Sequence, residues 1–128
     1  MRVFKTRIFA RFARSERIAD KTLAEVVRDA ERGLIDADLG NGLLKMRIAR
    51  KGEGKRGGYR SIVGYREAER AFFIFGFAKS ALDNLKPIQI DELRDAAADY
   101  MLRSDAEIED DIVAGRLVEV PYEENSED

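Results

Sequence analysis

The fold is decided by residues 43–79, LLKMRIARKGEGKRGGYRSIVGYREAERAFFIFGFAK. In residues 43–50 apolar side chains alternate with Lys45 and Arg47, and this period of two predicts a strand. The later stretches YRSIVGYR and RAFFIFGFA predict two more strands, separated by a tight turn at 67–69. Three consecutive strands with short connections predict an antiparallel meander.

Helical patterns precede the meander. Residues 2–5 alternate like a strand, and 6–14 have the apolar spacing of a short amphipathic helix. Thr22, followed three residues later by a glutamate, predicts a capping box at the start of a second helix that ends at Gly33. Residues 34–42 are rich in Asp, Asn and Gly and are expected to form a loop.

Further helices are predicted after the meander. One begins near Pro87, and a capping box at Ser104 starts another that stops at Gly115. Residues 117–120 fit either a short strand or a segment bound to a partner, and the acidic residues 123–128 are expected to be disordered. The pattern is that of an α+β fold: an N-terminal strand and two helices, an antiparallel β-meander, and C-terminal helices.

Length and composition narrow the possibilities. At 128 residues the chain fits one domain with one core, which we place at 1–103, followed by an acidic extension at 104–128 consisting of a helix and a disordered end. Histidine and cysteine are absent from the sequence, which excludes disulfides, Ser-His-Asp or Cys-His catalysis and the usual zinc ligands. No export signal is visible, so we expect a cytoplasmic protein.

Charge is strongly segregated along the chain. Residues 1–79 carry 19 Lys or Arg and 10 Asp or Glu, a net charge of +9, whereas residues 80–128 carry 4 and 15, a net charge of −11. A basic body of this kind favours a polyanionic partner, although two ordinary solvated surfaces would also explain it.

The basic residues concentrate on the meander, where ten Lys or Arg face three acids between residues 42 and 79. Arginine binds phosphate oxygens in a bidentate manner and lysine supplies a mobile charge. An antiparallel sheet can pack helices on one face and offer the other to solvent, so we expect a basic RNA-binding surface there. Its candidate residues are Lys45, Arg47 and Arg50 on the first strand, Lys51, Lys55 and Arg56 in the connection, and Tyr59 and Tyr65 as platforms for bases. The simpler alternatives are a solvated strand face, a solvated hairpin tip and two half-buried packing tyrosines.

Several segments carry a family resemblance. These are RVFKT at 2–6, FARFA at 9–13, AERGLIDADLG at 30–40, GGYR at 57–60 and FGFAK at 75–79. Together with the order of elements, they resemble the RelE/ParE superfamily of bacterial toxins from type II toxin–antitoxin systems, over about residues 1–100. The segment FGFAK is similar to the Gly-Phe-x-Lys signature of RelE/HigB-like members.

The resemblance implies a ribosome-dependent endoribonuclease that cleaves mRNA without a metal. In that mechanism the ribose 2′-hydroxyl attacks the adjacent phosphate, leaving a cyclic phosphate and a free 5′-hydroxyl. The Tyr-Arg pair of the family matches Arg60, which would stabilise the phosphate, and the signature lysine matches Lys79, which would take an active-site role. Lys45 and Tyr59 complete the predicted catalytic set, the tyrosine on grounds of reach alone. Some relatives use a C-terminal histidine that this sequence lacks.

The family also implies partners. We expect mRNA, the ribosome and a cognate antitoxin with a helix-turn-helix part, no membrane, and a monomer or weak dimer when the chain is alone. Two other functions stay open at this point: a ParE-like toxin that inhibits DNA gyrase by binding it, and a non-catalytic regulatory protein that binds the antitoxin.

Overall fold

The computed structural model describes residues 1–50, 54–79 and 85–123, with the backbone alone for residues 50 and 54–57. Its elements follow one another in this order: β1 (Arg2–Thr6), α1 (Arg7–Ser15), α2 (Asp20–Glu31), β2 (Ala37–Gly40), β3 (Leu43–Arg50), β4 (Gly54–Arg66), β5 (Arg70–Ala78), α3 (Pro87–Leu102), α4 (Asp105–Val113) and β6 (Leu117–Val120). The predicted α+β class is confirmed.

The strands form one sheet in the order β2-β3-β4-β5-β1-β6. The antiparallel pairs β3–β4 and β4–β5 are the predicted meander, and β1 lies parallel to β5. The expectation of a loop over residues 34–42 was wrong in part, because Ala37–Gly40 pairs with β3 as an edge strand. Residues 117–120 form the opposite edge by pairing with β1, which decides between the two alternatives for that segment.

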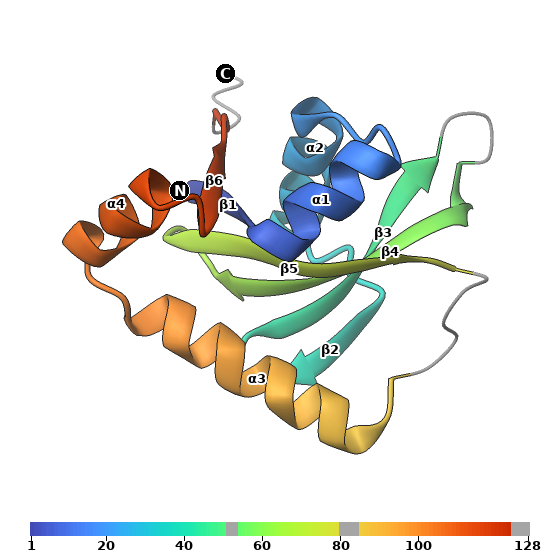
Figure 1. Ribbon diagram of the computed structural model, residues 1–128. Helices are drawn as coiled ribbons and strands as arrows, with labels where there is room; N and C mark the ends of the chain where they lie inside the picture. Colours follow the sequence, from blue (N-terminus) through green and yellow to red (C-terminus); the bar gives the residue numbers. More distant parts are fainter. Residues whose placement is uncertain (51–53, 80–84, 124–128) are drawn as a thin grey trace.

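Helices pack on both faces of the sheet (Figure 1). α1 and α2 cover one face, where Phe9, Leu23 and Phe73 belong to one buried cluster. α3 and α4 lie on the other side, where Phe72, Ala97 and Ile108 belong to a second cluster. The expectation of one wholly open sheet face is therefore wrong: α3 crosses that face and contacts β3, β4 and β5.

The helix termini follow from local hydrogen bonds. Thr6 caps α1 by accepting from the Phe9 N–H, and Ser104 with Glu107 forms the capping box predicted for α4. The capping box predicted at Thr22 is absent, because α2 begins two residues earlier at Asp20 and Thr22 lies in its first turn. None of the helices in the described ranges is long and apolar enough to span a bilayer.

The C-terminal segment is integral to the fold. Ile108 and Leu117 are fully buried, and Val120 contributes to the core under α1 and α2. Asp111 is also buried and accepts hydrogen bonds from Arg103 and Arg116, which joins the end of α3 to α4 and to the approach to β6. The packing therefore continues across residue 103, where an extension was expected to begin, and residues 124–128 lie outside the described part.

The Asp111 contacts change its titration. Burial raises the pKa of the Asp111 carboxyl, but the hydrogen bonds from Arg116 and Arg103 outweigh burial and hold the pKa below its usual range. The ionised carboxylate therefore favours the folded state.

Candidate anion-binding site

The side chains of β3 and β4 divide between the two sheet faces. Met46 and Ile48 of β3 and Val63 of β4 belong to the core under α1 and α2. Leu43 and Ile62 belong to the core on the α3 side. Alternation along each strand then puts Lys45, Arg47 and Arg60 on the α3 side of the sheet.

These three cations are neighbours in the sheet and meet at one carboxylate. Arg47 pairs with Arg60 in the β3–β4 register, and Lys45 pairs with Ile62 two residue pairs further along the same ladder. The Arg47 Nε donates to Asp36 Oδ1 at 3.0 Å, and the Arg60 Nε lies 3.3 Å from Asp36 Oδ2. The Lys45 Nζ is 3.8 Å from the same Oδ2. We call Asp36, Lys45, Arg47 and Arg60 the Asp36 cluster.

Burial differs within the Asp36 cluster. The Arg60 side chain is 8% exposed and Asp36 13%, whereas Arg47 is 45% exposed. Arg60 therefore lies at the base of the cluster, and Arg47 at its solvent edge. A buried guanidinium needs a charged or hydrogen-bonded partner, and Asp36 supplies one.

Asp36 was missing from the sequence-based candidates. It precedes β2, and its backbone N–H donates to the Lys45 carbonyl at 3.0 Å, which fixes it beside β3. The sequence signal was weak, because Asp36 lies in a stretch that reads as a polar loop. The pairing of β2 with β3 is what turns it into a partner for residues up to 24 positions away.

Lys79 lies just beyond the end of β5. Its side chain is exposed, and its backbone N–H donates to the Gly58 carbonyl at 3.2 Å. Two residues earlier, Phe77 pairs directly with Arg60. Continued alternation from Phe77 would bring Lys79 to the same side of the sheet as the Asp36 cluster.

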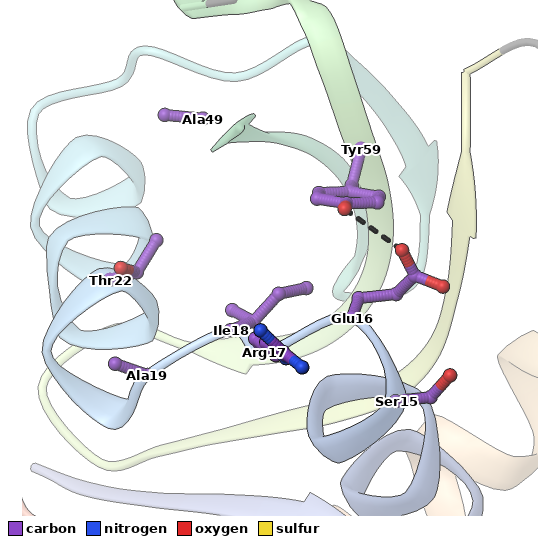
Figure 2. A pocket seen from close by; sticks show the side chains of 8 residues that line it. All are labelled: Ser15, Glu16, Arg17, Ile18, Ala19, Thr22, Ala49 and Tyr59. Atoms are coloured by element: carbon purple, nitrogen blue, oxygen red, sulfur yellow. Dashed lines mark hydrogen bonds between the residues drawn. The ribbon is translucent and has the colours of Figure 1, made fainter. Parts of the chain in front are cut away.

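Tyr59 lies on the opposite face from Arg60, so its predicted place in the same catalytic site is not supported. Adjacent residues of a strand point to opposite sides of the sheet, and Tyr59 is buried in the core under α1 and α2. Its hydroxyl donates to Glu16 Oε1 at 2.9 Å, as Figure 2 shows, and its ring meets Phe12 edge-on. The packing alternative is the one that the structure supports for Tyr59.

Tyr65 is on that same face, half-buried against the same core. Its hydroxyl is buried and has no hydrogen-bond partner among the described residues. Burial raises the pKa of Tyr65, and the charges of Glu31 and Glu67 raise it further. A tyrosine in this position is not presented to a base on the α3 side.

The four remaining predicted RNA-binding residues belong to the end of β3, the start of β4 and the sequence between them. Lys51 lies outside the described residues, and Arg50, Lys55 and Arg56 are described by their backbone only, within β3 and β4. The described residues contain no group of three or more carboxylates placed to hold a metal ion.

Two hollows lie near these residues. The larger, of about 620 Å³, lies on the α1/α2 side and is lined by the α1–α2 turn, Ala49 and Tyr59 (Figure 2). The other, of about 360 Å³, adjoins the Asp36 cluster and is lined by Asp36, Arg47, Met46 and the α2–β2 connection. Of the Asp36 cluster, Asp36 and Arg47 line this second hollow.

The fold and this site define a class: a small α+β protein whose sheet gathers three cations, from two adjacent strands, on one face. The family model described as the RelE toxin of the RelE / RelB toxin-antitoxin system matches residues 1–120. The chain therefore belongs to the RelE toxin family. The match runs through α4 and β6, in agreement with the burial of Ile108 of α4 in the core and the pairing of β6 with β1. A comparison with curated proteins found no match.

Proposed function

We propose that this chain is a RelE toxin that stops translation by cleaving mRNA on the ribosome. The observation that carries the proposal is the convergence of Lys45, Arg47 and Arg60 on one point of the sheet. Cleavage of mRNA is the general activity of the family to which the chain belongs. A cognate antitoxin is the partner that this family implies, and we propose a helix-turn-helix protein in a cytoplasmic complex.

The proposed reaction is an internal transfer at one phosphodiester. The ribose 2′-oxygen forms a bond to phosphorus while the bond from phosphorus to the 5′-oxygen breaks. The 2′-hydroxyl loses a proton and the leaving 5′-oxygen gains one, so the products are a cyclic phosphate and a 5′-hydroxyl end. Arg60 and Arg47 bind the non-bridging oxygens, whose negative charge grows in the transition state.

Lysine replaces the absent histidine in this proposal. Lys45 belongs to the Asp36 cluster and Lys79 lies at the end of the strand next to Arg60. As an ammonium group, either side chain can donate a proton to the leaving 5′-oxygen. Lys79 is exposed, so its substitution should leave the fold intact and report on chemistry alone.

The test is a translation reaction with purified protein, in which mRNA ends are mapped. Wild-type protein should cleave mRNA within the ribosomal A site, and Arg60→Ala and Lys79→Ala should each abolish the cleavage. Because Arg60 is buried, Arg60→Lys is a second variant that keeps a charge there. We expect it to fold and to cleave about 100-fold more slowly, because bidentate binding of the phosphate is lost. Arg66→Ala is the matched control: Arg66 lies on the same strand, half-exposed, and pairs with Glu69.

Two outcomes would replace the proposal. Intact mRNA together with blocked DNA supercoiling would identify a gyrase inhibitor of the ParE kind. Harmless overexpression without the antitoxin, with neither activity, would identify a non-catalytic binding partner. Cleavage that survives both Arg60→Ala and Lys79→Ala would keep the activity and reject the residues.

A further inference from the structure

We propose that the larger hollow, on the α1/α2 side of the sheet, binds a guanosine nucleotide, with Glu16 recognising the guanine base and arginines of the α1–α2 hairpin binding the phosphate. We call it the Glu16 hollow. The inference does not depend on the proposed mRNA cleavage, because the Glu16 hollow and the Asp36 cluster lie on opposite faces of the sheet. The residues that line the Glu16 hollow are Ser15, Glu16, Arg17, Ile18, Ala19, Thr22, Ala49 and Tyr59.

The Glu16 hollow has the dimensions of a small-molecule site. Its volume of about 620 Å³ lies within the range of about 300–1,000 Å³ that is typical of such sites. Figure 2 shows Thr22 and Ala19 on one side of it and Tyr59 and Glu16 on the other. Among the lining residues Tyr59 is buried, and the others are half-buried or exposed, so a ligand can enter from solvent.

Apolar groups form part of the wall. Ile18 and Ala19 come from the α1–α2 turn, Ala49 comes from β3, and Tyr59 contributes its ring. The ring is held in place by its edge contact with Phe12, at 5.6 Å between centroids. The flat faces of an aromatic base can be buried against atoms of this kind, which sugars and free phosphate would leave uncovered.

Glu16 gives the Glu16 hollow its chemical preference. The Tyr59 hydroxyl donates to Glu16 Oε1 at 2.9 Å, which orients the carboxylate. Glu16 Oε2 accepts no hydrogen bond from the described residues, and Oε1 has a second lone pair. A carboxylate only accepts hydrogen bonds, so its best partner presents two neighbouring N–H donors.

Guanine is the base that presents such a pair. Its Watson–Crick edge carries the N1–H and the N2 amino group side by side. Adenine and cytosine each place a ring-nitrogen acceptor beside their amino group, and uracil has one N–H between two carbonyl oxygens. A carboxylate is repelled by those acceptors, so the Glu16 hollow should select guanine.

Cations border the Glu16 hollow where a phosphate would lie. Arg17 lines it, and Arg14 and Lys21 are next in sequence to the lining residues Ser15 and Thr22. All three cations are exposed, and none has a hydrogen bond or an ion pair with a side chain in the described ranges. A guanidinium at this position can bind a phosphate through paired N–H donors.

The backbone at Arg17 adds a second indication of a ligand site. Its φ of 57° lies in the left-handed region, which is costly for residues other than glycine. Residues held in this conformation concentrate at ligand and active sites. Here the conformation turns the chain from α1 into α2 around the Glu16 hollow.

Titration of the full-length protein with nucleoside monophosphates, followed by calorimetry, tests the proposal. Guanosine 5′-monophosphate (GMP) should saturate the protein below about 1 mM, and adenosine 5′-monophosphate (AMP) should bind at least about 10-fold more weakly. Inosine 5′-monophosphate, which lacks the 2-amino group, should lie between them. Guanosine without phosphate should also bind less tightly than GMP, with a difference that shrinks as salt is added. Equal affinities for GMP and AMP, or no saturation by GMP, would overturn the proposal.

Two variants assign the binding to the Glu16 hollow. Glu16→Gln keeps an acceptor for Tyr59 and should lower GMP affinity about 10- to 100-fold while AMP affinity stays the same. Glu25→Gln is the matched control, because Glu25 is an exposed glutamate of α2 that pairs with Arg28, and its GMP affinity should equal that of wild type. Ala49→Leu fills the hollow from an exposed strand position and should prevent GMP binding even if Glu16→Gln does not fold. GMP affinity that is unchanged in Ala49→Leu would place the ligand elsewhere and reject the site.

The guanosine can come from two sources, a free nucleotide or an unpaired nucleotide of a folded RNA. An RNA hairpin with a single guanosine in its loop, compared with the same hairpin carrying adenosine, separates them. Tighter binding of the guanosine hairpin than of GMP identifies RNA as the source, and hairpins that bind alike beside selective GMP binding identify the free nucleotide. Glu16→Gln must weaken the binding in either case. These measurements use no ribosome, so the absence of mRNA cleavage would reject the proposed function and leave the nucleotide site standing.

Discussion

Replacing Gly76 by alanine should destabilise the protein, because α1 packs directly on that glycine. A Cβ at residue 76 would lie 2.5 Å and 2.6 Å from two ring carbons of Phe12 and 2.9 Å from one of Phe9. Carbon atoms in contact prefer about 3.5–4.0 Å, so the rings would have to retreat by about 1 Å. Phe9 is fully buried against Phe73 and has no room, so Phe12 is the ring that must move.

The cost can be estimated from these contacts. Overpacking by one methyl costs about 1–3 kcal/mol, and moving Phe12 would also disturb its edge contact with Tyr59, at 5.6 Å between centroids. Alanine is favoured over glycine in a strand by about 0.5–1 kcal/mol, which offsets part of this loss. A net loss of about 1–3 kcal/mol corresponds to a fall in Tm of about 4–11 °C for a chain of this size.

Thermal and urea denaturation of Gly76→Ala and Gly64→Ala measure the effect. Gly64 lies in the neighbouring strand, and a Cβ there would approach the Ala97 Cβ only to 3.2 Å, so its variant should lose less than about 1 kcal/mol. In a Phe12→Ala background two of the three close contacts disappear, and Gly76→Ala should then cost at least about 1 kcal/mol less than in wild type. The reasoning is refuted if Gly76→Ala melts with wild type, or if its cost is the same in both backgrounds.

Three further changes test other parts of the fold. Tyr59→Phe removes the hydrogen bond to Glu16 and should lower the free energy of unfolding in urea by about 0.5–1.5 kcal/mol, while the folded protein cleaves mRNA at the wild-type rate. A large loss of cleavage rate would return Tyr59 to the catalytic set. Ile108→Ala removes a fully buried side chain and should lower the free energy of unfolding by about 2–5 kcal/mol, with the whole chain still unfolding in one transition. Unfolding in two steps would show instead that residues after 103 unfold separately. Because the pKa of Asp111 is lowered in the folded state, its contribution to the free energy of unfolding should be complete above about pH 4 and lost as the pH falls through the pKa of the folded state. The difference in stability between wild type and Asp111→Asn should therefore narrow from pH 7 to pH 3. A constant difference would contradict this.

The central part of the fold was predictable because its signal is local. Period-two alternation in β3 and the apolar run of β5 identify strands without knowledge of their partners, and the short turn at 67–69 sets their order. The edge strand β2 was missed because its sequence, ADLG, has low strand propensity and leads into a turn with positive φ at Gly40, Asn41 and Gly42. Only pairing with β3 makes it a strand.

The candidate site was predictable to the same extent. Alternation along β3 is enough to put Lys45 and Arg47 on one face, and the register between β3 and β4 adds Arg60 to that face. The same alternation could have separated Tyr59 from Arg60, because neighbours in a strand cannot share a face. The place of Asp36 in the site depends on the pairing of β2 with β3 and on the reach of three long side chains. No local sequence pattern carries this information.

The two faces of the sheet are coupled at the strand that carries Arg60. Tyr59 ties β4 to the α1–α2 turn through Glu16, and its carbonyl accepts from the Arg60 Nη1 at 3.3 Å. On β5, α1 packs directly on Gly76, and the next residue, Phe77, pairs with Arg60. The glycine of the Gly-Phe-x-Lys segment therefore meets a packing need on the helix side, whereas continued alternation from Phe77 would bring the lysine that ends it to the cationic side. Packing on the α1 face therefore holds the backbone of β4 and β5 on the side opposite to the Asp36 cluster.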